Sequence, residues 1–254
     1  MTPLRDRLRI EVQIGGAAIS KHEPTSVEGR LIAIGDIHGC STALRTLLEA
    51  IGPRLQDTIV TLGDYVDWGP DSRGVIELLM DLSKQCHLVS LRGNHEEMLL
   101  EALELEALGS DAMMRSWLAL CGEETLSSYP YEGGDKVIPK EHVEFLRNCQ
   151  DYYETAAHIF VHANYDPQLP LDQTPRTTLG WKFIDDDELQ MHVSGKTVVV
   201  GHTPQVSGLV LNRGFLVGID TDCSRGGWLT ALNVNNQVVT QANQEGRIRM
   251  SVLT

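Results

Sequence analysis

The sequence of 254 residues is short of basic residues and has no long apolar run. Its 21 Lys and Arg against 35 Asp and Glu give a formal net charge of −14. This charge argues against a duplex nucleic-acid partner, because binding to the phosphate backbone relies on Lys and Arg. No run approaches the length needed to cross a membrane, and the start, MTPLRDRLRIEVQIGG, lacks the apolar centre of a signal peptide. We therefore expect a cytoplasmic protein with no membrane partner.

Paired cysteines are also missing. The chain has five cysteines, an odd number, and none of them forms a CxxC pair. Their scatter argues against a disulfide framework and against a structural zinc site. It predicts buried, reduced thiols, as is usual in the cytosol, at positions Cys40, Cys86, Cys121, Cys149 and Cys223.

The chain is long enough, with 42% apolar residues, for one large or two small domains with a buried core. Residues 1–28 alternate only weakly between apolar and polar residues. We interpret them as an N-terminal extension, with an edge strand as an alternative, and residues 29–254 as the functional domain.

Short apolar runs alternate with amphipathic stretches from Arg30 onward. Helices are expected at 41–51, capped by Ser41 or Thr42 and stopped by Gly52, at 71–82, and at 96–108, whose glutamates are expected to be solvated. Residues 109–155 are expected to be helical and irregular, and 165–195 to form a polar loop. The pattern predicts an α/β protein with a mixed sheet or a two-sheet sandwich. Its strands are expected at 30–36, 58–64, 87–95, 158–164, 197–203, 215–221 and 228–234.

Polar side chains follow five of the predicted strands, where each strand ends. Sites in α/β sheets form at the carboxyl ends of strands, because the loops that follow them converge there. A single histidine after a strand is usually a turn or packing residue. Five strands that each end in ligand-type residues at one edge favour a shared site. The residues are Asp36 and His38, Asp64 and Asp67, Arg92, Asn94 and His95, His162, and His202.

These side chains are typical metal ligands. Imidazoles, carboxylates and an amide are too many for one tetrahedral zinc ion, but they suit two divalent ions such as Mn, Fe or Zn. Asp64 is the natural candidate for a bridging carboxylate. Glycines beside the ligands fit sites where the backbone turns sharply and approaches an ion closely. The alternative, that an aspartate only caps a helix, fits Asp71 better than Asp36, Asp64 or Asp67.

Five motifs resemble those of the calcineurin-like metallophosphoesterases, and most closely the compact bacterial form of the phosphoprotein phosphatase family. They are GDIHG (35–39), GDYVDWG (63–69), RGNHE (92–96), VHAN (161–164) and GHT (201–203). A later stretch, GIDTDCSRGGWLTAL (218–232), is similar to the symmetrical diadenosine tetraphosphate hydrolases. The resemblance implies a central β-sandwich of mixed sheets flanked by helices, and two divalent metal ions, manganese first, with Fe, Zn or Co as alternatives.

The resemblance also implies a role for each residue. Asp36 and His38 would hold the first metal, and Asn94, His162 and His202 the second, with Asp64 shared. A hydroxide between the metals would attack phosphorus, and His95 would act as general acid, oriented by Asp67. Arg92 would bind phosphate oxygens.

Trp68 departs from the family, which usually has arginine at this position as a further phosphate contact. Tryptophan offers no bidentate pair of donors to a phosphate. Either Arg92 suffices or another cation substitutes; alternatively, Trp68 stacks on an aromatic substrate or only packs against its loop. The candidate cations are Arg73, Arg176, Lys182 and Arg225.

The predicted function is that of a serine/threonine protein phosphatase acting on phosphoproteins or phosphorylated small molecules. The alternatives are a dinucleoside polyphosphate hydrolase and a phosphotyrosine-tolerant phosphatase. A catalytically silent binding module would have lost a ligand or His95, and none is missing. The sequence does not indicate an oligomeric state.

Overall fold

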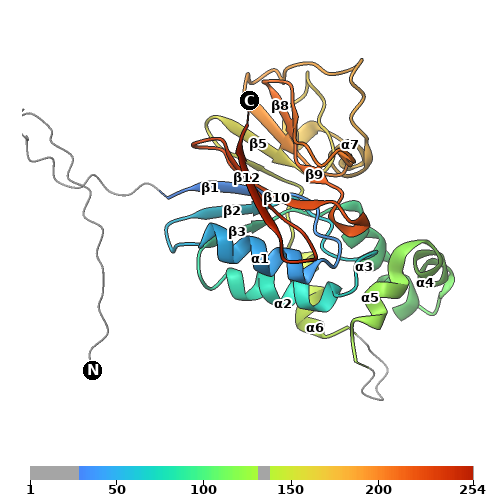
Figure 1. The fold of residues 1–254 in the computed structure, drawn as a ribbon. Coiled ribbons are helices and arrows are strands. Elements are labelled where there is room, and N and C mark those ends of the chain that lie inside the picture. The colour runs from blue at the N-terminus through green and yellow to red at the C-terminus, as the bar shows by residue number, and fades with distance from the viewer. Residues whose placement is uncertain (1–28, 131–137, 254) are drawn as a thin grey trace, which may run out of the picture.

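The computed structural model describes residues 29–130 and 138–253, so the predicted extension at 1–28 lies outside the described residues. Two β-sheets lie face to face, with helices on their outer sides (Figure 1). One sheet has the strand order β12-β11-β10-β1-β2-β3, with β9 also paired to β10. The other has the order β4-β5-β6-β8-β7. The predicted sandwich of mixed sheets flanked by helices is confirmed.

The first sheet has one antiparallel and one parallel half, whereas the second has a parallel centre and antiparallel edges. In the first, β1, β2 and β3 are parallel, and β10 pairs antiparallel with β1. Its strands are β1 (Leu31–Ile34), β2 (Thr58–Thr61), β3 (His87–Ser90), β9 (Asp220–Thr221), β10 (Trp228–Asn233), β11 (Val238–Ala242) and β12 (Ile248–Val252). The second sheet contains β4 (Tyr152–Glu154), β5 (His158–Val161), β6 (Thr197–Val200), β7 (Leu211–Asn212) and β8 (Leu216–Gly218).

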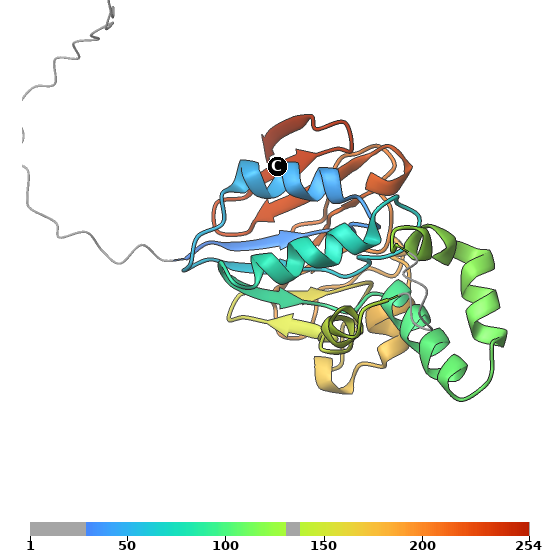
Figure 2. The same cartoon turned by 90° about the horizontal axis from the view of Figure 1, so that it is seen from below.

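The helices lie mainly along the first sheet, where α1 and α2 run side by side across its outer face (Figure 2). The 3-10 helix η2 and the helix α7 both fall inside the stretch predicted to be a polar loop, 165–195. The elements are α1 (Ser41–Ile51), α2 (Ser72–Leu82), α3 (Asn94–Ala107), α4 (Ala112–Trp117), the π-helix η1 (Leu118–Gly122), α5 (Glu123–Ser127), α6 (Lys140–Arg147), the 3-10 helix η2 (Leu171–Gln173), α7 (Arg176–Trp181) and the 3-10 helix η3 (Cys223–Arg225).

The helix ends test the predicted caps. Asp71 caps α2, because its carboxylate accepts the backbone N–H of Gly74 at 2.9 Å. Gly52 ends α1 in the left-handed conformation that glycine adopts without strain, as predicted. The predicted cap by Ser41 or Thr42 is wrong, since α1 begins at Ser41 itself and has no side-chain cap.

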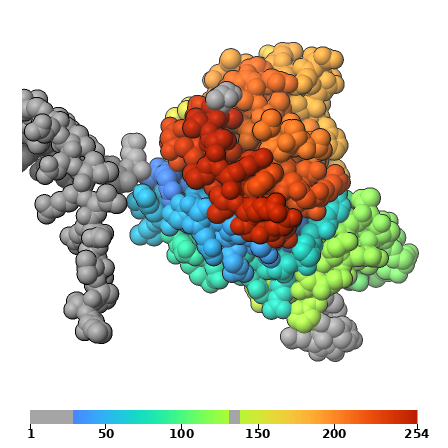
Figure 3. All heavy atoms as spheres, in the orientation of Figure 1, coloured from blue at the N-terminus to red at the C-terminus, as the bar shows by residue number. Residues whose placement is uncertain are grey.

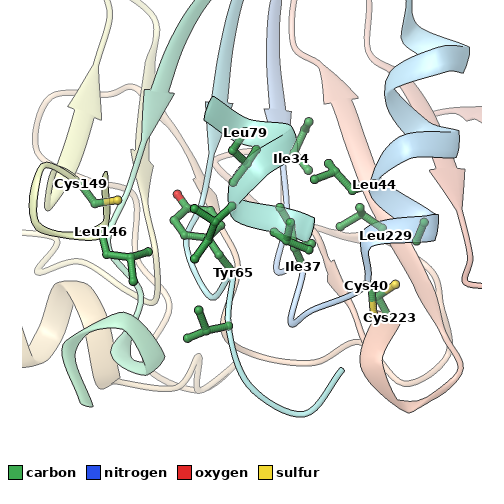
Figure 4. Packing of buried hydrophobic residues seen from close by; sticks show 14 of the residues in the cluster. Ile34, Ile37, Cys40, Leu44, Tyr65, Leu79, Leu146, Cys149, Cys223 and Leu229 are labelled. Carbon is green, nitrogen blue, oxygen red and sulfur yellow. The ribbon is translucent and has the colours of Figure 1, made fainter. Parts of the chain in front are cut away.

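The core has layers on both sides of the first sheet, because successive side chains of a strand point to opposite faces. Ile32 and Ile34 pack against α1 and α2, whereas Ala33 faces the second sheet. Figure 4 shows part of the helix-side layer, including the sulfur atoms of Cys40 and Cys223 close to each other. All five cysteines are free and buried, so the prediction of buried thiols is confirmed. No helix among the described residues has the length and apolar character needed to cross a bilayer.

A partly buried ion pair joins the first two strands at their starting ends. The Asp57 carboxylate, 1% exposed, accepts hydrogen bonds from the backbone and the guanidinium of Arg30 and from the backbone of Arg54. Arg30 also donates to the carbonyls of Ile51 and Gly52 at the end of α1. Burial alone would raise the pKa of Asp57, but these hydrogen bonds outweigh it and lower the pKa below the usual 3.8.

Asp57→Asn is expected to lower the free energy of unfolding by about 3 kcal/mol at neutral pH, the lower end for breaking a buried pair. Because the folded pKa is depressed, the wild-type advantage is present above the unfolded value of 3.8 and disappears as pH falls through the folded value. Urea unfolding at pH 7 and at pH 3 measures both effects. The control is Asp81→Asn, whose carboxylate is exposed. An equal loss at both pH values would contradict the assignment to the charged pair.

Candidate dinuclear metal centre

The carboxyl ends of β1, β2, β3, β5 and β6 converge at one end of the sandwich. Among the described residues, ligand-type atoms there form three groups, each within 4.8 Å, and Asp64 belongs to two of them. One of these two also contains His38 and His95, and the other contains His162 and His202; the third group consists of Asp67, His95 and Cys121. The structure brings eight of the nine predicted site residues together as buried side chains; they are Asp36, His38, Asp64, Asp67, Asn94, His95, His162 and His202.

Each histidine ligand candidate is oriented by a backbone carbonyl. Nδ1 of His38 lies 2.9 Å from the oxygen of Val66, and Nδ1 of His162 lies 2.8 Å from that of Leu62. Nε2 of His202 lies 3.1 Å from the oxygen of Trp181. A carbonyl accepts only, so these nitrogens carry the protons. The other nitrogen of each ring therefore has a free lone pair, as in ligating histidines.

Those free lone pairs point at one another. Nε2 of His162 lies 3.0 Å from Oδ1 of Asn94, 3.2 Å from Nδ1 of His202 and 3.5 Å from Oδ2 of Asp64. On the opposite side of Asp64, Nε2 of His38 lies 3.4 Å from the same Oδ2. With the ring protons already engaged, none of the three imidazoles places a hydrogen between these atoms. A convergent set of acceptors without donors is what a bound cation requires, so the residues fit two divalent ions.

Buried carboxyl groups add further acceptors to the set. Oδ1 of Asp36 is buried without a hydrogen-bond partner, while its Oδ2 accepts the backbone N–H of His202 at 2.9 Å. Burial, and then the charges of Asp220 and Asp64, raise the pKa of Asp36 well above its usual value. Burial raises the pKa of Asp64 to about 8 and that of Asp220 to about 6. Asp220 was not predicted from the sequence; its signal is the Gly-Ile-Asp at the end of β8.

The backbone around the site is strained. Seven described residues other than glycine have a positive φ, a conformation that costs side-chain-bearing residues energy, and all but Gln237 belong to the site or its rim. The six at the site or its rim are His38, Asp64, Asp67, Trp68, His202 and Asp222. Glycine is needed where the backbone passes the ligands: a Cβ at Gly93 would lie 2.0 Å from Oδ1 of Asp64, and one at Gly201 would lie 2.0 Å from Oδ1 of Asp36.

His95 and Asp67 form a hydrogen-bonded pair beside the two groups, with Nδ1 of His95 2.7 Å from Oδ2 of Asp67. Asp67 is fully buried and also accepts the indole N–H of Trp117 at 3.1 Å, the thiol of Cys121 at 3.2 Å and the hydroxyl of Thr125 at 2.7 Å. The segment from α4 through the π-helix to α5 therefore holds this carboxylate in place. The sequence did not indicate this role of the segment.

The protonation of His95 follows from these contacts. Burial alone would lower its pKa, but the Asp64 charge and then the hydrogen bond to Asp67 raise the pKa of His95 to about 11. The imidazole therefore carries both protons at neutral pH. A buried, protonated imidazole held by a carboxylate is suited to act as a general acid.

The profile of one family, described as calcineurin-like phosphoesterase, matches residues 29–236. The chain belongs to the calcineurin-like phosphoesterase family. Serine/threonine-protein phosphatase 1 of Salmonella typhimurium is 43% identical over 70 residues, 27% of this chain and 31% of the relative. An asymmetrical bis(5'-nucleosyl)-tetraphosphatase of Oceanobacillus iheyensis is 27% identical over 225 residues, 78% and 86% of the two chains. A solved structure described as a putative diadenosine tetraphosphatase has a TM-score of 0.61 at 25% identity, and the match covers 89% of this chain and 95% of that one. The chain thus spans less than a third of the Salmonella phosphatase but most of the other two.

Glu96 holds the metallophosphoesterase loops in place, a role that the sequence did not reveal. The expectation of a solvated glutamate is wrong here, because Glu96 is fully buried. Its carboxylate accepts the backbone N–H of Asp64 at 2.8 Å, Tyr65 at 2.7 Å, Val66 at 3.3 Å and Gly93 at 2.9 Å. The bond to Gly93 lets α3 begin at Asn94, two residues earlier than predicted, which places Asn94 and His95 on its first turn.

Glu96→Gln is expected to lower the free energy of unfolding by about 2–4 kcal/mol, because an amide presents one acceptor oxygen and leaves buried N–H groups unpaired. Activity is expected to fall with stability, since the bonds to Asp64 and Gly93 position ligands. Urea unfolding and kcat/KM are the measurements, and Glu101→Gln, an exposed glutamate of the same helix, is the control. A variant as stable as the wild type would show that Glu96 is not the anchor of this loop.

Arg92 is the predicted residue that the structure does not bring to the metal ligands. Its Nη2 donates to the carbonyls of Arg147 at 2.9 Å and Cys149 at 3.1 Å, where α6 ends. A guanidinium at a helix C-terminus satisfies carbonyls that have no partner within the helix. Both contacts use Nη2, whereas Nε of Arg92 is buried without a hydrogen-bond partner. The phosphate contact remains a prediction for Arg92.

Trp68 lies over the site. Its ring centroid is 4.4 Å from that of His38 and 4.5 Å from that of His95, and the residue is 37% exposed. The side chain therefore both packs against two site histidines and faces the solvent at the mouth of the centre.

Proposed function

We propose that this protein is a dinuclear metal-dependent phosphomonoester hydrolase that acts on phosphoserine and phosphothreonine in proteins. The observation that carries the proposal is the pair of ligand groups that share Asp64, with the hydrogen-bonded pair of His95 and Asp67 beside them. Two divalent cations bound there would lower the pKa of a shared water and stabilise negative charge on the phosphoryl oxygens.

Each residue of the site then has a defined role. Asp36 and His38 would hold one cation, Asn94, His162 and His202 the other, and Asp64 both. His95 gives its Nε2 proton to the leaving oxygen, which for a serine ester would otherwise depart as a strongly basic alkoxide. Asp67 keeps the His95 ring in place and stabilises its protonated form through the 2.7 Å contact to Nδ1.

A dinucleoside polyphosphate hydrolase is the second candidate, favoured by aromatic side chains near His202. Phe183 is 60% exposed, with its ring centroid 4.5 Å from that of His202, and the neighbouring Trp181 is 38% exposed. Exposed rings beside a phosphate site can stack on a nucleobase. The names of the Oceanobacillus relative and of the solved diadenosine tetraphosphatase support the same alternative.

The deciding experiment compares kcat/KM of the manganese-loaded protein for a phosphoserine peptide and for diadenosine tetraphosphate, with a phosphotyrosine peptide in parallel. We expect a preference for the phosphoserine peptide. A preference for the dinucleotide would replace the proposal with the second candidate, and Phe183→Ala would then be expected to raise KM for the dinucleotide only. Preference for phosphotyrosine would make the enzyme a tyrosine phosphatase.

Three further predictions belong to this proposal. Manganese is the expected cation, the cytoplasm is the expected compartment, and residues 29–254 are expected to act as one catalytic domain. Metal analysis of the protein purified without added cations tests the first.

A further inference from the structure

A guanidinium lies over the face of the Trp68 indole. The Cζ atom of Arg225 is 4.6 Å from the centroid of the Trp68 ring, which in turn contacts His38 and His95. Arg225 therefore lies at the site although it follows Trp68 by more than half the chain.

A rigid turn presents this arginine. Arg225 ends the short helix η3, between Asp222 and Gly226, which both have left-handed backbone conformations with φ of 62° and 89°. Strands β9 and β10 flank the turn, and the backbone N–H of Gly227 donates to the carbonyl of Asp222 at 2.9 Å. A Cβ at Gly227 would lie 2.2 Å from the carbonyl oxygen of Thr221, so the turn is closely packed. The position of Arg225 is thus set by the backbone as well as by the indole.

Among the four candidate cations, Arg225 is the least committed to protein partners. Arg73 donates to Glu77 at 2.8 Å, and Lys182 donates to Glu188 at 2.7 Å. Arg176 pairs with Glu97 and Asp151 and donates to the carbonyl of Arg92. The ion pair of Arg225 with Asp222 spans 3.9 Å, beyond hydrogen-bond distance, and the Arg225 side chain is 56% exposed.

We propose that Arg225 binds the non-reacting oxygens of the substrate phosphate, taking the place of the arginine that the family carries at position 68, with Trp68 as its platform. The inference rests on the proposed phosphatase function. A planar guanidinium that stacks on an aromatic face keeps its edge N–H donors free for a bidentate contact with phosphate. Trp68 and Arg225 thus form one unit, although the ring and the cation come from distant parts of the sequence.

The first test measures the Kd of inorganic phosphate for the manganese-loaded protein by isothermal titration calorimetry, together with kcat and KM for the phosphoserine peptide. Arg225→Ala is expected to weaken phosphate binding about 10- to 100-fold, the value of a charged hydrogen bond, with a matching loss in kcat/KM. Arg225→Lys is expected to recover little of this, because lysine has neither the planar stack nor the paired donors. The control is Arg247→Ala, an exposed arginine paired with Glu245.

The second test exchanges the pair. The double variant Trp68→Arg with Arg225→Trp is expected to bind phosphate nearly as tightly as the wild type, whereas Arg225→Trp alone binds it weakly. Unchanged phosphate binding in Arg225→Ala would overturn the proposal, as would a double variant no better than Arg225→Trp. Tight, Arg225-dependent phosphate binding by a protein that does not hydrolyse the phosphoserine peptide would overturn the proposed function instead and leave this inference standing.

Discussion

Replacing Asp64 with asparagine is expected to lower kcat/KM by about 10³-fold or more, because the hydrolytic chemistry depends on both cations being held together. Oδ2 of Asp64 is 3.4 Å from Nε2 of His38 and 3.5 Å from Nε2 of His162, so one carboxylate serves both groups. The amide keeps the shape and the acceptor that receives the backbone N–H of His95 at 3.2 Å, but it lacks the charge. The loss therefore reports on charge and metal binding, and not on local geometry.

Thermal unfolding with and without manganese separates this explanation from a structural one. Wild-type protein is expected to gain stability on adding manganese, whereas Asp64→Asn gains little. Without cations the variant is expected to be about as stable as the wild type, because burial raises the pKa of Asp64 to about 8 and the uncharged acid resembles the amide. Asp111→Asn, on an exposed helix end, serves as the control. An inactive variant with full stabilisation by manganese would show that Asp64 is not the shared ligand.

His95→Asn is expected to slow hydrolysis of a phosphoserine peptide by about 10²- to 10⁴-fold, the usual contribution of a general acid. Hydrolysis of an aryl phosphate is expected to slow far less, because a phenolate leaves without a proton. The reason lies in the high pKa of His95, which keeps a proton at Nε2, and in the 2.7 Å contact that holds the ring. The ratio of kcat values for the two esters is the measurement.

The manganese content of the same variant decides between two roles, because His95 groups with His38 and Asp64 among the ligand-type atoms. If His95 is a general acid, its replacement leaves the metal content at the wild-type value. If His95 is a metal ligand, its replacement lowers the metal content. Asp67→Asn should show the same preference for aryl esters in milder form, because the imidazole remains but loses its charged partner. Equal slowing of both esters would remove His95 from the role of leaving-group acid.

The sequence was informative where chemistry depends on strand ends. A buried strand followed at once by Asp, His or Asn leaves few places for the side chain, so Asp36, Asp64 and His162 could be located from a local pattern. The same holds for Asp71, whose capping bond spans only three residues. The two-sheet architecture also followed from local periodicity, although β4, β7, β11 and β12 were not predicted.

Residues whose roles depend on distant partners were not visible in the sequence. Glu96 lies on an acidic helix whose later glutamates, Glu101, Glu104 and Glu106, are indeed exposed, and only the loop about thirty residues earlier distinguishes it. Thr125 and Trp117 reach Asp67 across 50 or more residues. No periodicity carries such information, because it arises from the way helices pack on the sheet.

The order of strands in the first sheet has a consequence for how the protein is made on the ribosome. β1 is the first strand of the described chain, yet its neighbours are β2 and the late strand β10, and Figure 3 shows the C-terminal segment in red lying against the N-terminal segment in blue. One edge of β1 therefore stays unpaired until residue 233 has emerged, and an unpaired edge is a site for aggregation. His162 and His202 also arrive late, so a nascent chain offers cations only part of the centre. The ligand set is accordingly complete only after His202 has been made, and truncation before β10 should yield an aggregating product and not a smaller enzyme.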